Sequence, residues 1–225
     1  MKPMNDKHFA ILRRHMIEMI GIHIDLMSDE LGNSAFDPRV LAAMQKVPRH
    51  LFVPQPLMQV AYEDAPLPIG FNKTISQPFI AALMTDLLEP EPHETVLEVG
   101  TGLGYHAAVL AELANRIYSV EIVEEFAGEA EARLQQMGYS NIEIRVGDGS
   151  RGWADHAPYD KILVTAAADK PPPALPQQLK LGGRMVLPMG GDDAQVLATV
   201  QKDDSGRLEI QESIPVRFTR LETVI

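Results

Sequence analysis

A glycine-rich stretch after a short apolar segment is the part of this sequence best suited to bind a ligand. Gly100, Gly102 and Gly104 follow the apolar segment 95–99. Such glycines permit a sharp turn with positive φ and let a ligand touch the backbone, and a helix that follows presents unpaired N–H groups. We therefore predict a ligand site between a strand and a helix. His106 lies in the first turn of that helix, where we expect a surface position, with a position facing the ligand as the alternative.

The spacing and the charge of this glycine loop favour a ligand without phosphate groups. A dinucleotide fold uses G-x-G-x-x-G to hold a pyrophosphate. This chain has G-x-G-x-G, preceded by the acidic Glu98, which would repel a phosphate. S-adenosylmethionine carries no phosphate but has a ribose and an ammonium group. We expect S-adenosylmethionine as the ligand, with Glu98 and Thr101 among its contacts, and a nicotinamide cofactor as the weaker alternative.

Polar or small residues follow the next predicted strands as well. In an open α/β sheet, ligands bind outside the carboxyl ends of the strands. Glu121 ends the second strand, where a carboxylate is placed to accept both ribose hydroxyls. Asp148 and Gly149 follow the third strand, and Asp148 is a candidate acceptor for the adenine amine. Thr165 and Ala166 follow the fourth strand and leave room for the methionine part. The alternatives are that Glu121 caps a helix and that Asp148 only forms a turn.

The elements that position these residues alternate between strands and helices. The periodicity predicts strands over residues 95–99, 116–121, 142–146, 161–165 and 184–187, and helices over 105–113, over 124–137 and shortly after 173. This alternation predicts an α/β fold, a Rossmann-like, mostly parallel, doubly wound sheet. Segments 196–200 and 208–218, joined across 203–206, predict a hairpin at the edge of the sheet.

The chain before this pattern is expected to be a helical and irregular addition. Apolar residues recur at three- and four-residue steps over 9–31, which predicts one amphipathic helix or two helices broken near Gly21. Asp37 is a candidate N-cap followed by a proline, which predicts a short helix over 39–45.

The next segment, 48–72, is rich in proline and aromatic residues and has no clear period, so we expect ordered irregular structure there. Ser76 is a candidate N-cap for a helix over 79–88. We expect one structural unit, in which an addition of residues 1–73 packs on a core of residues 74–225.

Composition excludes several classes of protein. The 225 residues, 45% of them hydrophobic, suffice for one sizeable core. A net charge of −11 argues against a protein that neutralises nucleic-acid phosphates. The absence of cysteine excludes thiolate sites, and the seven histidines show no metal-ligand spacing, so we expect no metal. No segment is suited to span a bilayer or to act as a signal peptide, so we expect a cytoplasmic protein without a membrane partner.

Several short motifs occur in a fixed order between about residues 40 and 190. They are V-P-R-H-L-F-V-P at 47–54, A-Y-E-D at 61–64, L-P-I-G at 67–70, T-I-S-Q-P at 74–78, the glycine loop, G-D-G at 147–149, and Q-L with G-G at 178–183. Together they resemble the protein-L-isoaspartate O-methyltransferase family. The resemblance implies S-adenosylmethionine as methyl donor, S-adenosyl-L-homocysteine as product, and L-isoaspartyl residues of damaged peptides and proteins as acceptor, with D-aspartyl residues as a further candidate.

The same resemblance implies that Ser76 is the active-site serine, and it places Thr74, Ile75 and Gln77 among the residues beside the donor. A carboxylate acceptor is already ionised at neutral pH and needs no general base. We therefore expect Ser76 to orient the acceptor by donating one hydrogen bond, rather than to attack it.

The chain departs from the family pattern in two places that concern the acceptor. Val216, Arg217 and Phe218 are candidates for holding the substrate peptide, but they are followed by Thr-Arg where the family usually has Val-Pro. After residues 165–167, Ala168 stands where the family usually has proline. These departures leave two alternatives: a relative that methylates a different carboxylate, and a non-catalytic binding module that keeps the nucleotide fold. The sequence leaves the oligomeric state open.

Overall fold

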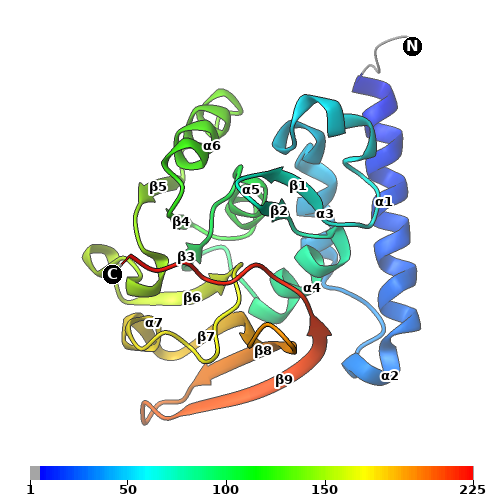
Figure 1. The fold of residues 1–225 in the computed structure, drawn as a ribbon. Coiled ribbons are helices and arrows are strands. Elements are labelled where there is room, and N and C mark those ends of the chain that lie inside the picture. Colours follow the sequence, from blue (N-terminus) through cyan, green and yellow to red (C-terminus); the bar gives the residue numbers. More distant parts are fainter. Residues whose placement is uncertain (1–5, 225) are drawn as a thin grey trace.

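The computed structural model describes residues 6–224, so the first five residues of the predicted addition and the last residue of the predicted core lie outside the described part. A seven-stranded sheet of order β5-β4-β3-β6-β7-β8-β9 forms its centre (Figure 1). The strands are β3 (Thr95–Val99), β4 (Arg116–Glu121), β5 (Ile142–Val146), β6 (Tyr159–Val164), β7 (Leu179–Gly190), β8 (Gln195–Lys202) and β9 (Leu208–Val216).

Strand β3 is the point at which the strand order reverses. It pairs in parallel with β4 on one side and with β6 on the other. β5 and β7 extend the parallel sheet, whereas β8 and β9 pair antiparallel at its edge. The predicted fold class and edge hairpin are therefore confirmed. β7 is longer than the predicted strand over 184–187 because its whole second half pairs with β8.

The helices cover the sheet and form most of the N-terminal addition. They are α1 (Asp6–Leu26), α2 (Ser28–Leu31), α3 (Pro38–Lys46), α4 (Pro78–Leu88), α5 (Tyr105–Ala111), α6 (Glu124–Gln136) and α7 (Ala174–Gln178). The predicted N-cap at Asp37 is confirmed, since its side chain accepts a hydrogen bond from the Arg39 N–H. None of the helices in the described residues has the length and apolar character needed to cross a membrane.

Helix α1 runs without a break through Gly21, so the predicted break near this glycine is wrong, and the predicted single helix is correct only as far as Leu26. The buried residues Ile20 and Ile24 flank the glycine on the inner face. Burying such side chains outweighs the cost of about 1 kcal/mol that a glycine imposes on a helix. The break falls instead at Met27, before α2.

The segment predicted as irregular contains a small hairpin. β1 (Leu67–Gly70) pairs antiparallel with β2 (Lys73–Ile75), and Phe71 and Asn72 between them have φ of 48° and 55°. Two successive left-handed residues are typical of a tight hairpin turn. The hairpin was missed because phenylalanine is rarely found in this conformation. It brings the chain to residues 74–78 at the carboxyl end of the sheet.

The N-terminal addition shares one apolar core with the sheet. From α1, the buried residues Phe9, Met16, Ile20 and Ile24 belong to the same buried cluster as Val96 of β3. In Figure 1, α1 forms one flank of the molecule, with α3 and α4 on its inner side.

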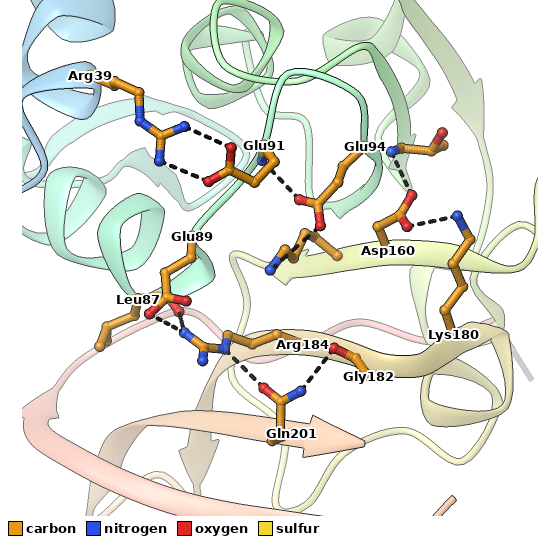
Figure 2. A network of polar contacts seen from close by, with 12 residues as sticks. Arg39, Leu87, Glu89, Glu91, Glu94, Asp160, Lys180, Gly182, Arg184 and Gln201 are labelled. Atoms are coloured by element: carbon orange, nitrogen blue, oxygen red, sulfur yellow. Dashed lines mark hydrogen bonds and ion pairs between the residues drawn. The ribbon is translucent and has the colours of Figure 1, made fainter. Parts of the chain in front are cut away.

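A network of charged side chains joins the addition to the amino ends of the strands, away from the glycine loop (Figure 2). Arg39 of α3 donates to both carboxylate oxygens of Glu91, at 3.1 and 3.0 Å. Asp160, at the start of β6, accepts from the Thr95 N–H at 2.8 Å and pairs with Lys180 at 2.7 Å. These contacts fix where β3 begins, and thereby where its glycine loop lies.

Candidate functional site

Two adjoining cavities lie at the carboxyl ends of the central strands. The wider one has a volume of about 460 Å³ and the narrower one about 80 Å³, and both are bordered by Gly100 and Gly102. Of the predicted site residues, the wider cavity is also lined by Thr74, Ile75, Ser76, Gln77, Thr101, Thr165, Val216, Arg217 and Phe218. The narrower cavity is also lined by Thr74, Glu121, Gly149, Thr165 and Ala166. The fold thus brings most of the predicted residues together.

Three predicted residues do not line either cavity. Glu98 is fully buried behind the glycine loop. Gly104 starts α5 with φ of 94°, and a Cβ there would lie 3.2 Å from the Cβ of Ala130 in α6, so this glycine permits close helix packing. Asp148 lies behind the turn that begins with Gly149.

The carboxylate of Glu121 is held at the narrower cavity by two backbone groups. Its Oε2 accepts from the Gly102 N–H at 2.7 Å and its Oε1 from the Val123 N–H at 2.9 Å. The second contact orders the turn before α6, but α6 has Val123 as its N-cap and no side-chain cap, so the alternative interpretation of Glu121 as a helix cap is wrong. Each carboxylate oxygen has a second lone pair, so a fixed acceptor for ligand hydroxyls is still present.

Asp148 is engaged by a turn and by the C-terminal tail. Its Oδ1 accepts from the N–H and the hydroxyl of Ser150, and its Oδ2 accepts from the Val224 N–H at 3.1 Å. Burial raises the pKa of Asp148, but these hydrogen bonds outweigh it and the pKa lies below its usual value. Asp148 is therefore an ionised acceptor, and it also ties residue 224 to this end of the sheet.

Ser76 is not the N-cap of α4, contrary to the prediction. The helix begins at Pro78 with Gln77 in the capping position, and neither provides a side-chain cap. The carboxylate of Asp64 takes this role, because its Oδ1 accepts from the Phe79 N–H at 2.9 Å. Within the described residues, the hydroxyl of Ser76 forms no hydrogen bond, and it lines the wider cavity.

The buried Arg49 and the half-buried Asp64 of the N-terminal addition fix the backbone on both sides of Ser76. Arg49 is fully buried and donates to the carbonyl oxygens of Ala61, at 2.8 Å, and of Ser76, at 2.6 Å. Asp64 accepts from the side chain of Gln77 at 3.0 Å. Since a buried charge is costly unless it is hydrogen-bonded, these contacts hold the loop in one conformation.

His23 adds a contact from α1 to the same loop. Its Nδ1 lies 2.9 Å from Oδ2 of Asp64, and its ring packs against Phe79 at 4.3 Å between centroids. Our sequence analysis gave no role to His23, Arg49 or Asp64. For Arg49 and Asp64 the sequence did hold a signal. Each is a charged residue with apolar or aromatic residues nearby, and such a charge needs a hydrogen-bond partner when it is buried. No comparable signal marked His23.

The two segments that carry the departures from the family pattern contact each other through the neighbours of Ala168. The Ala167 N–H donates to the Thr219 carbonyl and the Leu221 N–H donates to the Ala167 carbonyl, both at 2.8 Å. Arg220 pairs with Asp169 at 2.9 Å. The tail after β9, red in Figure 1, is thereby held across the carboxyl ends of the strands, and residues 219–222 line the narrower cavity.

His106 lies in the wall of the wider cavity and not on the surface as expected. It is buried, and its Nε2 lies 2.8 Å from the hydroxyl of Thr85. Burial, with a smaller effect of the positive charge on Arg49, lowers the pKa of His106 to about 3. The imidazole is therefore neutral at physiological pH and adds no charge to the cavity.

Glu98 is the other strongly perturbed group. Burial raises its pKa to about 8, although a hydrogen bond from Ser119 opposes the shift, and nearby Glu121 adds to it. Glu98 is therefore mostly protonated at neutral pH. Its role in this structure is to support the glycine loop from behind, through Ser119 and Thr101, whose hydroxyls lie 2.6 Å apart.

Comparisons with known proteins agree with this geometry. Residues 24–223 match the model of the family described as protein-L-isoaspartate(D-aspartate) O-methyltransferase. A relative from Polaromonas sp. (strain JS666), named protein-L-isoaspartate O-methyltransferase 1, is 52% identical over 97% of this chain and 93% of its own length. Another from Syntrophobacter fumaroxidans, named protein-L-isoaspartate O-methyltransferase 2, is 49% identical over 96% of this chain and 88% of its own.

Solved structures show the same fold. One named protein-L-isoaspartate O-methyltransferase superimposes with a TM-score of 0.79 at 26% identity and covers 92% of this chain. This chain spans 65% of that longer protein, slightly less than two thirds. A Plasmodium falciparum structure in complex with S-adenosyl-L-homocysteine has a TM-score of 0.72 at 22% identity, over 84% of this chain and 92% of its own, and supports the fold alone.

The raised pKa of Glu98 predicts a pH dependence of stability. Between about pH 4.5 and pH 8 the unfolded chain loses the Glu98 proton while the folded chain keeps it, so the free energy of unfolding falls as the pH rises through this window. We expect Glu98→Gln to remove this contribution, so that wild type loses stability relative to the variant between pH 5 and pH 8.

Urea denaturation of the ligand-free proteins at several pH values measures this difference. Glu131→Gln, at an exposed position of α6, is the control and should keep the pH dependence of wild type. Parallel curves for wild type and Glu98→Gln would show that Glu98 is ionised in the folded protein.

Proposed function

Because the chain belongs to the protein-L-isoaspartate(D-aspartate) O-methyltransferase family, we propose that it transfers the methyl group of S-adenosylmethionine to the carboxylate of L-isoaspartyl residues in damaged proteins, with D-aspartyl residues as a further substrate. The observation that carries the proposal is the position of Ser76. Its hydroxyl has no hydrogen-bond partner among residues 6–224 and lines the same cavity as the glycine loop, so an acceptor bound at Ser76 would lie close to a donor bound at that loop.

The residues of the narrower cavity fit the donor. S-adenosylmethionine supplies an electrophilic methyl group on a sulfonium. Glu121, held by two backbone N–H groups, accepts from the ribose hydroxyls with its remaining lone pairs. Gly100 and Gly102 expose backbone toward the same space, and Thr165 and Ala166 leave room beside them. We assign Asp148 to the adenine end, where its carboxylate is ionised.

The residues of the wider cavity fit a carboxylate acceptor. Ser76 donates a hydrogen bond to one oxygen of the acceptor and leaves the other oxygen free to attack the methyl carbon. Arg49 does not line the cavity, but it fixes the Ser76 carbonyl and so orients the hydroxyl. The acceptor is already ionised, so no residue has to remove a proton, in agreement with the neutral His106.

We assign Val216, Arg217 and Phe218 to the peptide side of the same cavity. Gln195 accepts from the Phe218 N–H at 2.7 Å and donates to its carbonyl at 3.1 Å, so this segment has a defined backbone. The Val-Pro pair of the family is absent, but the contacts of Thr219 and Arg220 with residues 167–169 hold the tail in its place.

Two broader expectations from the sequence belong to the proposal. We propose that residues 1–73 and 74–225 form one structural unit. The apolar core that the two parts share supports this proposal. A cytoplasmic location, without nucleic-acid or membrane partners, rests on the sequence alone.

The direct test is a methyl-transfer assay with two matched peptides. The pure protein is incubated with labelled S-adenosylmethionine and a short peptide with one L-isoaspartyl residue, or its normal L-aspartyl counterpart. We expect base-labile label in the isoaspartyl peptide alone. Donor binding without transfer to either peptide would favour a relative that methylates a different carboxylate, and failure to bind the donor would favour a non-catalytic module.

Replacing Ser76 tests its assigned role. A hydrogen bond to a charged group contributes about 1.5–3 kcal/mol, so Ser76→Ala should lower kcat by about 10- to 100-fold. The affinity for S-adenosylmethionine, measured by calorimetry, should change by less than about twofold, since Glu121 and the glycine loop are intact. Ser205→Ala, in the distant hairpin turn, is the control. A collapse of donor affinity in Ser76→Ala would contradict the orienting role.

Replacing Gly100 tests the donor loop. Its φ is 94°, and a Cβ there would lie 2.3 Å from the hydroxyl oxygen of Thr165, so Gly100→Ala must displace the loop. We expect at least about a tenfold loss of S-adenosylmethionine affinity and a lower melting temperature.

The matched control is Gly128→Ala in α6, where a Cβ would meet nothing within 4 Å. This variant should bind the donor like wild type, and its stability should be unchanged or raised by about 0.4–1 kcal/mol. Wild-type donor affinity in Gly100→Ala would refute the assigned role of the loop.

A further inference from the structure

Helix α1 has an apolar stripe on its outer face in addition to its buried inner face. The stripe is formed by four large apolar side chains whose exposed fractions are 63% for Ile11, 43% for Met19, 53% for Ile22 and 77% for Leu26. Nothing in the described part of the chain covers these side chains. Clustered exposed apolar residues are unusual on a monomeric protein and mark interaction surfaces.

The spacing places these residues in one line along the helix. At 100° per residue, Met19, Ile22 and Leu26 lie within roughly 80° of Ile11, on the side opposite Ile20 of the inner face. With 21 residues, α1 is about 31 Å long, and the stripe extends over most of it. Helix α1 also lies on the flank of the molecule, with the rest of the fold on its inner side (Figure 1).

The exposed charges beside the stripe are separated along the helix. Apart from Asp6 at its first residue, the amino-terminal half carries Lys7 and Arg14, and the carboxyl-terminal half carries Glu18 and Asp25. A second α1 lying antiparallel would place its acidic half against the basic half of the first. A parallel α1 would place like charges together. The charge pattern is therefore complementary to itself in one orientation only.

We propose that the outer face of α1 is the interface of a symmetric homodimer, in which two copies of α1 pack antiparallel. Ile11 then lies next to the partner's Ile22, Arg14 lies beside the partner's Glu18, and Lys7 lies beside the partner's Asp25. The two-fold axis repeats each of these contacts. Burial of the apolar stripe drives the association, whereas the charges select the antiparallel orientation.

This surface is separate from the methyl-transfer site. The family match begins at residue 24, so most of α1 precedes it, and no residue of the stripe lines either cavity. The proposal therefore does not depend on the proposed activity, and dimer formation leaves the carboxyl ends of the strands accessible.

Sedimentation equilibrium of the full chain between about 1 and 100 µM tests the dimer. We expect the mass to rise with concentration from 24.8 kDa toward twice that value. Ile22→Gln should weaken association at least about tenfold, while Leu181→Gln, at a 59% exposed leucine of β7, should have no effect. Circular dichroism checks that both variants are folded, and methyl transfer should be unchanged in both.

A charge exchange tests the antiparallel orientation. Arg14→Glu should weaken the dimer, because it places an acidic group against the partner's Glu18. Adding Glu18→Arg in the same chain should recover part of the lost association, since the new arginine faces the partner's new glutamate. A double variant that associates no better than Arg14→Glu would overturn the proposed orientation.

Two outcomes would overturn the dimer itself. If the protein stays monomeric up to 100 µM and does not bind mixed phosphatidylcholine and phosphatidylglycerol vesicles, the dimer is refuted and the stripe is assigned to binding a different protein. A monomer that binds such vesicles, and loses this binding with Ile22→Gln, would assign the stripe to a lipid surface.

Discussion

The burial of Arg49 is the constraint on which the position of Ser76 in the wider cavity depends. A guanidinium keeps its charge in the protein interior, so it must find acceptors when it is removed from water. Here the acceptors are backbone carbonyls, one of them that of Ser76. The position of the serine is thus set by the electrostatic requirement of a residue 27 positions earlier. Asp64 acts in the same way on the other side, because it binds the side chain of Gln77 and the amide of Phe79.

This arrangement explains why a helical addition accompanies a nucleotide-binding sheet. The sheet alone provides the glycine loop and Glu121, the residues to which we assign most of the donor contacts. It provides nothing that would fix a hydroxyl opposite that donor. The addition supplies Arg49, Asp64 and His23, and it is joined to the sheet by a shared apolar core and by the charged network around Arg39 (Figure 2). The addition therefore fixes the loop of Ser76 beside a cavity whose other walls come from the sheet and from the segment after β9.

Sequence patterns predicted most of the sheet and most of the residues that line the two cavities, because strand periodicity and glycine spacing are local properties. The failures have a common cause in contacts between distant residues. Ser76 has the side chain of an N-cap, yet Asp64, 12 positions earlier, takes that role. His106 begins a helix, where exposure is usual, but the helix points its start into the cavity wall. The turn at Phe71 and Asn72 lacks the glycine that would have marked it. A local sequence pattern therefore does not predict the cap of α4, the burial of His106 or this turn.

The C-terminal tail has a practical consequence for work with this protein. The Val224 N–H binds Asp148, Arg151 donates to the Val224 carbonyl, and residues 219–222 line the narrower cavity. A purification tag fused to the carboxyl terminus would therefore follow closely in sequence on residues that line the narrower cavity, and we expect it to disturb the contacts of this tail. The hairpin turn at 203–206, at a far corner of the molecule in Figure 1, is the better place for an inserted label.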